Sequence, residues 1–347
     1  MAYTTIDKPT DYFNTVLYTG NGSTQSITGV GFQPDFVWLK GRSVVAGHNL
    51  HDVVRGVNKQ VYTNTADAQE TLTTLVTSFD SDGFSLGSNG NANSNTKTFV
   101  AWNWLAGGSA SSNSDGSITS SVSANTTAGF SVVTYTGTGS AATVGHGLGA
   151  VPQWLMVKNT GASANWRVYH VSQGNTKAAA LNITTEQAVA DAGFWNNTTP
   201  TSSVFSIGSG YADSTNASSN TYVAYCFAEK KGYSKFGSYT GNGNADGPFI
   251  YTGFAVSWLM MKRTDSAAEW LIYDNKRDPF NLRDTRLEAQ DNFADSTGTT
   301  KVFDFLSNGF KCKGNDSDIN ASGGNYIYMA FAEAPFVSSG KVPTTAI

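Results

Sequence analysis

Three stretches of this chain open alike, and this internal repeat constrains the fold more than any other feature. Each opening contains Tyr-Thr-Gly, at 17–22, 134–139 and 238–243. Each is followed by an apolar stretch that contains tryptophan and ends in lysine, at 36–40, 154–158 and 258–262. The period of roughly 100 residues suits a small domain and exceeds the about 20 to 50 residues of a solenoid repeat. The sequence therefore predicts three tandem copies of one β domain.

The composition favours many short strands joined by turns. Charged residues make up only 14% of the 347 residues, whereas glycine reaches 36 residues and aromatic residues 12%. Glycine-rich turns between short apolar runs are typical of β proteins. The net charge of −4 and the lack of a basic run argue against nucleic acid as a partner. The chain has no long apolar run for membrane insertion, and its first residues lack the basic and apolar blocks of a signal peptide.

The closing strand of each repeat shows the two-residue period of a β-strand. In 100–104, 223–227 and 327–331, large side chains occupy one face and mostly small ones the other. This pattern suits a strand within a two-layer sandwich. One segment per repeat, at 66–75, 184–192 and 283–294, has a helical or irregular pattern and is expected to cross a sandwich edge. The predicted fold class is all-β, with three tandem β-sandwich domains of jelly-roll or lectin-like type and short helical crossings.

The expected boundaries follow the repeats. We predict an N-terminal arm at 1–15, repeats at 16–107, 115–231 and 236–336, and a C-terminal tail at 337–347. The Gly/Ser/Asn-rich stretch 107–114 is predicted to be a flexible linker. The junction between repeats two and three is shorter, so these two are expected to lie closer together. Arm and tail are expected to dock on another surface, such as a neighbouring subunit, and a homo-oligomer is expected.

The sequence does not point to catalytic chemistry. The four histidines lie outside any nucleophile motif, and the acidic residues around Asp82-Gly83 have the pattern of a turn. Cys226 and Cys312 fall at non-equivalent places in their repeats, so both are expected to be free thiols. We therefore predict no catalytic residues, no metal site and no cofactor, and expect that the protein is not an enzyme.

A few residues are candidates for ligand binding. Asp274 and Arg277 match Asp52 and Arg55 of repeat one, and such a pair either braces a loop or contacts a ligand. Tryptophans at 38, 154 and 258 are expected in the core because they share a strand position. Other tryptophans lie outside the opening and closing strands, where aromatic rings beside Asn and Thr suit sugar stacking. The candidate ligand-binding residues are therefore Trp166, Trp195, Trp270, Asp274 and Arg277.

Several motifs resemble a domain of virion proteins of tailed phages, especially those infecting marine bacteria. The resemblance rests on 18–22, 31–40, 81–87, 273–280 and 326–333 and extends over nearly the whole chain beyond the arm. It implies a structural virion protein with no assigned catalytic residues, located on tail fibres or the head surface. Repeat two departs from the pattern, because His170 and Gln173 stand where the other repeats have the Asp–Arg pair.

We expect a protein of the virion, synthesised in the cytoplasm of the host bacterium and exposed on the particle. The leading hypothesis is a tail fibre or receptor-binding adhesin that recognises host surface glycans and contacts other virion proteins, with weak contacts summed by multivalency. Capsid decoration or a tail connector, with a purely structural role, is the alternative. A polysaccharide depolymerase is the third hypothesis and would need a pair of carboxylates in a groove.

Overall fold

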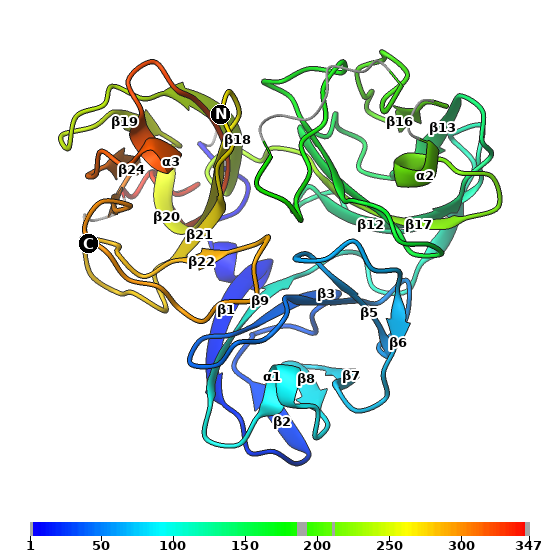
Figure 1. Ribbon diagram of the computed structural model, residues 1–347, viewed down its shortest axis with the longest axis horizontal. Coiled ribbons are helices and arrows are strands. Elements are labelled where there is room, and N and C mark those ends of the chain that lie inside the picture. The colour runs from blue at the N-terminus through cyan, green and yellow to red at the C-terminus, as the bar shows by residue number, and fades with distance from the viewer. Residues whose placement is uncertain (1–2, 186–192, 210–211, 344–347) are drawn as a thin grey trace.

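The alternating closing strands lie at the centre of three antiparallel sheets. The computed structural model describes residues 3–185, 193–209 and 212–343 (Figure 1). In each repeat the closing strand pairs with the opening strand on one side and with the Trp-Lys strand on the other. In sheet order these triplets are β1 (Phe13–Thr19), β9 (Thr98–Trp104) and β3 (Phe36–Gly41); β12 (Phe130–Thr136), β17 (Thr221–Phe227) and β14 (Trp154–Asn159); β18 (Ser234–Thr240), β25 (Asn325–Pro335) and β20 (Phe254–Arg263).

Further strands widen these larger sheets. They are β4 (Asn49–Asp52), β5 (Lys59–Tyr62) and β6 (Glu70–Thr71) in repeat one; β10 (Ser111–Asn113), β11 (Ser120–Asn125) and β15 (Arg167–His170) in repeat two; β21 (Trp270–Asp274) and β22 (Leu287–Glu288) in repeat three. β4, β15 and β21 are equivalent, since each pairs with the Trp-Lys strand of its repeat. The loops that follow these three strands contain the Asp–Arg pairs or their replacements.

A smaller sheet covers the outward face of each larger sheet and completes a sandwich. These sheets are β2 (Gln25–Thr28), β8 (Gly83–Leu86) and β7 (Val76–Asp80); β13 (Ala142–Gly145) and β16 (Val204–Ile207); β19 (Phe249–Tyr251), β24 (Gly309–Cys312) and β23 (Phe303–Leu306). Each sandwich has its own apolar core. The all-β sandwich class is thus confirmed.

The helices are not where the sequence placed them. One-turn helices precede the closing strands, namely α1 (Gly90–Asn93), α2 (Ala212–Thr215) and α3 (Ser317–Asn320), and a 3₁₀ turn (Pro9–Asp11) precedes β1. The predicted crossings at 66–75 and 283–294 are irregular and contain only β6 and β22. Most of the crossing predicted at 184–192 lies outside the described residues. The first and third crossings follow the edges of their larger sheets through β6 and β22, so their backbones are not organised by an apolar helical face.

The large faces of the closing strands point to a core shared by all three repeats. Trp104 of repeat one, Phe227 of repeat two and Phe331 of repeat three belong to one buried cluster. The Trp104 ring lies 5.8 Å from that of Trp258 and 6.4 Å from that of Phe227. The small faces, with Ala101 for example, face the separate sandwich cores. Three sandwiches therefore surround one aromatic centre, as the three lobes of Figure 1 show.

The stretch predicted to be a flexible linker is ordered. The buried carboxylate of Asp35 accepts hydrogen bonds from the backbone of Ala106 (2.8 Å) and Gly108 (3.0 Å). The next residues form β10, which pairs with β11. At Gly107 the backbone passes close to a neighbouring strand, since a Cβ there would lie 2.5 Å from the carbonyl oxygen of Ala124.

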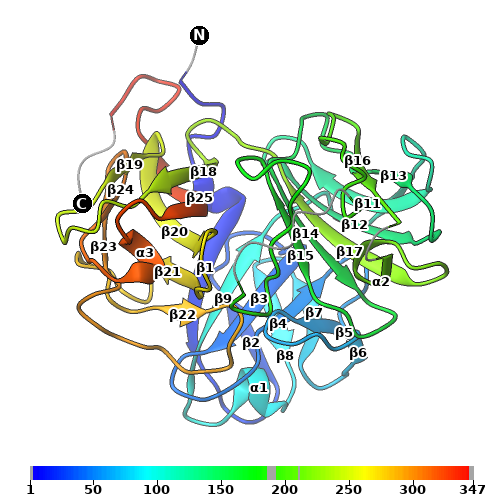
Figure 2. The ribbon, with the colours of Figure 1, turned by 45° about the horizontal axis from the view of Figure 1, so that its top comes forward.

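The arm docks on the end of the second repeat and on the third repeat of its own chain. Thr4 donates a hydrogen bond to the carbonyl of Lys231 (2.8 Å), and Ile6 is buried in the shared core. The Phe13 ring stacks on Phe331 at 4.9 Å. Asp7 accepts a hydrogen bond from the backbone of Ser339, so arm and tail meet on the same side of the molecule (Figure 2). The expected docking occurs within one chain and needs no neighbouring subunit.

Candidate functional site

The three candidate tryptophans are buried. Trp166 and Trp270 have no exposed surface, and Trp195 is 1% exposed. The Trp195 indole donates to the carbonyl of Lys177 (2.9 Å) inside the second sandwich. No face of these rings is open to a sugar, and the structure therefore corrects the prediction that they stack against a ligand.

Trp166 and Trp270 instead join neighbouring repeats. Each lies eight residues after the lysine of its Trp-Lys strand, and the same position in repeat one is His48. All three side chains contact a backbone carbonyl of another repeat: Trp166 Nε1 that of Tyr62 (2.7 Å), Trp270 Nε1 that of Ala180 (2.8 Å) and His48 Nε2 that of Glu288 (3.0 Å). Repeat two thus binds repeat one, three binds two, and one binds three. We call these boundaries the 1/2, 2/3 and 3/1 seams, and they close a ring.

The lysines that end the Trp-Lys strands reinforce every seam. Lys40, Lys158 and Lys262 are fully buried, and each ammonium donates to the carbonyl six residues further on, at 2.7 to 2.9 Å. Each ammonium also donates to a carbonyl of the preceding repeat around the ring, such as Phe293 (2.6 Å) for Lys40 and Ala66 (3.0 Å) for Lys158. Burial lowers the pKa of each of the three lysines to about 8.

The two Asp–Arg pairs are loop braces that also bond across a seam. In both pairs arginine Nε lies 2.5 Å from the aspartate. The same aspartate accepts the backbone N–H of its arginine. Asp52 also accepts from the hydroxyl of Tyr225 (2.8 Å), and Asp274 from the indole of Trp102 (3.1 Å). Asp274 and Arg277 are thus occupied by protein partners, so the predicted brace is supported and the ligand contact is not.

Repeat two fills the same loop with neutral groups. His170 replaces the aspartate, and its Nε2 lies 3.4 Å from the carbonyl of Tyr328. Burial lowers the pKa of His170 to about 4, which favours the neutral ring. The side chain that corresponds to Tyr225 and Trp102 is Met329, which has no donor to offer. The departure of repeat two from the pattern therefore accompanies the loss of a donor on the facing strand.

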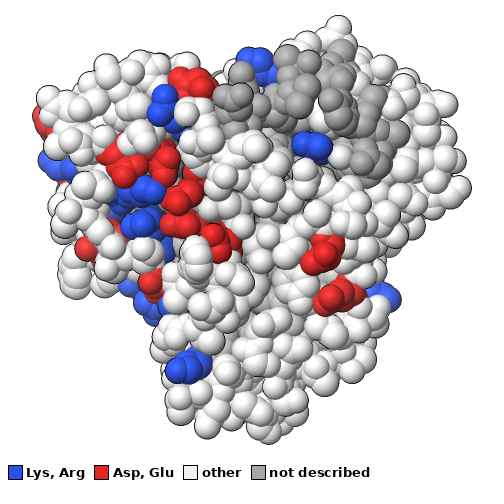
Figure 3. All heavy atoms as spheres, viewed as in Figure 1, with Lys and Arg blue, Asp and Glu red and all other residues white. Residues whose placement is uncertain are grey.

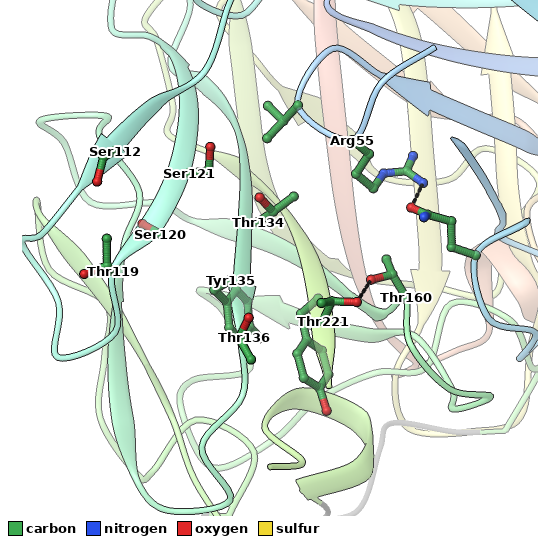
Figure 4. A pocket seen from close by; sticks show the side chains of 13 residues that line it. Arg55, Ser112, Thr119, Ser120, Ser121, Thr134, Tyr135, Thr136, Thr160 and Thr221 are labelled. Carbon is green, nitrogen blue, oxygen red and sulfur yellow. Dashed lines mark hydrogen bonds between the residues drawn. The ribbon is translucent and has the colours of Figure 1, made fainter. Parts of the chain in front are cut away.

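Open grooves lie at two of the seams. The 1/2 groove has a volume of about 520 Å³ and runs between the Arg55 loop and strands β11, β12 and β17 (Figure 4). The 2/3 groove, of about 410 Å³, lies between the Gln173 loop and strands β18 and β25. Corresponding residues line both grooves, for example Thr136 and Thr240 of the opening strands and Thr160 and Thr264 after the lysines. Both volumes lie in the range of roughly 300 to 1,000 Å³ that is usual for small-molecule sites.

Charge is concentrated in the third repeat. The stretch 236–336 contains 22 Lys, Arg, Asp and Glu residues, against 10 in 115–231. On the face shown in Figure 3 these side chains gather over the third lobe and its boundary with the first. Within the described residues, no three His, Cys, Asp or Glu side chains are grouped to hold a metal ion, and no helix is long and apolar enough to span a membrane. Cys226 and Cys312 are free and buried, as predicted.

Sequence reasoning missed the grooves and the buried lysines. Alignment of the repeats on their lysines would have placed His48 with Trp166 and Trp270, which is the signal for a shared structural role. The grooves gave no such signal, because their walls are ordinary threonines and serines from different repeats.

These contacts define a class: an all-β protein in which three similarly built sandwiches close a ring around one core. A family model described as a domain of unknown function, DUF7483, matches residues 8–335, and the chain belongs to that family. The match extends across all three repeats, in agreement with their shared core. No curated protein sequence matches the chain.

Proposed function

We propose that this chain is an exposed structural protein of a tailed-phage particle that adheres to host surface glycans through the recesses at its seams. The observation that carries the adhesin role is the recurrence of an open polar groove at corresponding places in two seams. Weak sites repeated on a rigid ring, and again on many copies per particle, give strong attachment without any tight single contact. The virion location rests on the resemblance of the repeat motifs.

A purely structural role, as capsid decoration or tail connector, is the second candidate. It is favoured by the burial of Trp166, Trp195 and Trp270, and by the N-terminal arm, which bonds to residues of the later repeats. A depolymerase is not favoured, since Asp265 is the only carboxylate among the described residues that line either groove. Burial alone would raise the pKa of Asp265, but the hydrogen bond from Arg263 lowers it. A carboxyl group with a lowered pKa is poorly suited to act as a general acid.

The test is the position of the protein on intact particles, combined with adsorption competition. Electron cryo-microscopy should place it at the distal tail or on an exposed surface, with the grooves open to solvent. Purified protein added to host cells should then compete with particles for attachment. Density enclosed between head or tail subunits, or a lack of competition, would refute the adhesin role and leave the structural one.

A further inference from the structure

We infer that the 1/2 and 2/3 grooves are two corresponding binding sites, each for one neutral pyranose unit, and that the 3/1 seam is closed to such a ligand. The inference rests on the proposed function, because the sugar would be a unit of a host surface glycan. It adds the location, number and chemical class of the sites.

The first step is the structural equivalence of the two grooves. One wall of each groove is the loop that follows the equivalent strands β4 and β15. The other wall belongs to the next repeat and consists of its opening strand, its closing strand and the residue two positions after its buried lysine. Backbone hydrogen bonds repeat as well: the N–H of Thr160 donates to the carbonyl of Thr221, and the N–H of Thr264 to the carbonyl of Asn325, both at 2.8 Å. Thr221 and Asn325 hold the same place in their closing strands. A ligand that fits one groove therefore meets a similar frame in the other.

The second step is a side chain without partners in the wall of the 2/3 groove. Both amide atoms of Gln173 are shielded from water and lack a hydrogen-bond partner. Its counterparts differ: Arg55 and Arg277 bond their own aspartates and further acceptors. A shielded amide without partners is unfavourable, because it has lost its hydration and gained no hydrogen bond in return. Rotation of Gln173 toward the groove would break no hydrogen bond, and its amide offers one donor and one acceptor to a pair of neighbouring hydroxyls.

The third step is the character of the lining. In the 1/2 groove, serines and threonines supply most of the side chains, and Arg55 is neutralised by Asp52. Gln69 provides an amide there, and its Oε1 accepts a hydrogen bond from Arg55 (3.2 Å; Figure 4). The 2/3 groove has one acid, Asp265, which is paired with Arg263, and one base, Lys177. Many hydroxyls, an amide and few unpaired charges suit a neutral polyhydroxyl ligand better than an anionic one.

The fourth step is the closure of the remaining seam. At the 3/1 seam the residue that corresponds to Thr160 and Thr264 is Arg42. Its Nε lies 2.8 Å from Asp295, which also lies 3.0 Å from Arg277 Nη1. These side chains are at most 22% exposed, so an ion-pair bridge crosses the seam where threonines leave room at the other two.

The experiment uses the full chain and ligand-observed NMR with glucose, galactose, mannose and N-acetylglucosamine. One exposed threonine recurs at the same place in each opening strand, and tryptophan there should fill the groove. Thr136→Trp should remove the 1/2 site, Thr240→Trp the 2/3 site, and the double variant should abolish binding. Thr19→Trp is the matched control at the 3/1 seam and should bind as the unchanged protein does. Gln173→Leu should weaken the 2/3 site about tenfold, the effect of one or two lost hydrogen bonds, whereas exposed Gln33→Leu should not.

The outcomes separate this inference from the proposed function. Binding of none of the four sugars, or equal loss in Thr19→Trp and Thr240→Trp, would overturn the two-site inference. If the double variant still competes with particles for host attachment, the inference fails while the adhesin role stands. Sugar binding confined to the grooves, with attachment unaffected by excess free protein, would confirm the sites and overturn the adhesin role.

Discussion

At the 3/1 and 2/3 seams the same loop packs against the closing strand of the next repeat, but it does so with a charged pair at one seam and a neutral ring at the other. At the 3/1 seam a buried ion pair, Asp274–Arg277, bonds the indole of Trp102 on the facing closing strand. At the 2/3 seam the neutral ring of His170 contacts a backbone carbonyl of repeat three, and the closing-strand residue at the position of Trp102 is Met329. A buried carboxylate needs donors to offset its lost hydration, whereas a neutral imidazole needs fewer. The donor on the facing strand and the charge in the loop therefore change together.

The largest effect should come from breaking the ion pair. Asp274→Ala leaves the fully buried guanidinium of Arg277 with only the partly exposed Asp295 as counter-ion, and it removes the acceptor for Trp102. Loss of one partner of a buried pair costs about 3 to 5 kcal/mol. The free energy of unfolding, measured in urea, should fall by that amount. His170→Ala at the other seam should cost only about 1 to 2 kcal/mol, since it removes two hydrogen bonds to neutral backbone groups and the packing against Trp154 but strands no charge; equal losses would contradict the contrast.

The three buried lysines should contribute alike to stability at all seams, and the pH dependence of the free energy of unfolding tests this. Burial lowers the folded-state pKa of Lys262 from 10.5 to about 8. Between these values the unfolded chain binds more protons than the folded protein, so this lysine makes the free energy of unfolding rise with pH. Lys262→Met should remove up to about 3 kcal/mol of that rise between pH 7.5 and 10. Lys40→Met and Lys158→Met should match it, while exposed Lys97→Met should parallel the unchanged protein; unequal seams would argue against a common role.

A smaller loss is expected when an indole contact across a seam is removed. Trp270→Phe deprives the carbonyl of Ala180 of its donor and leaves a small void, at a cost of about 2 kcal/mol. Trp166→Phe should cost about as much at the 1/2 seam. Because the repeats share one core, circular dichroism and tryptophan fluorescence should report a single coincident transition in both variants. Separate transitions for the repeats would contradict the closed ring.

The sequence predicted the repeats and the sandwiches but not the ring. Alternation in 100–104 distinguishes two faces of the strand, yet it cannot say that the face with Trp102 and Trp104 meets two other repeats rather than its own second sheet. The position of Trp166 and Trp270 outside the main strands suggested exposure, while their carbonyl partners lie in another repeat, about 90 or more residues away. The Asp–Arg brace was predictable because both partners lie within one loop. Contacts between repeats could not be predicted from the sequence, because their partners are distant along the chain and only the structure shows which repeats meet.

The smallest effect on stability should accompany the most informative change in binding. Arg42→Thr gives the 3/1 seam the residue found at both open seams and breaks a partly exposed bridge, while Asp295 keeps Arg277 as a partner. The unfolding free energy should fall by less than about 1 kcal/mol. If the bridge is what closes this seam, the variant gains a third sugar site, and Thr19→Trp, neutral in the unchanged protein, now lowers binding. Unaltered sugar binding in Arg42→Thr would mean that the loops, and not the ion pair, decide which seams are open, because every other described contact of the seam is retained in this variant.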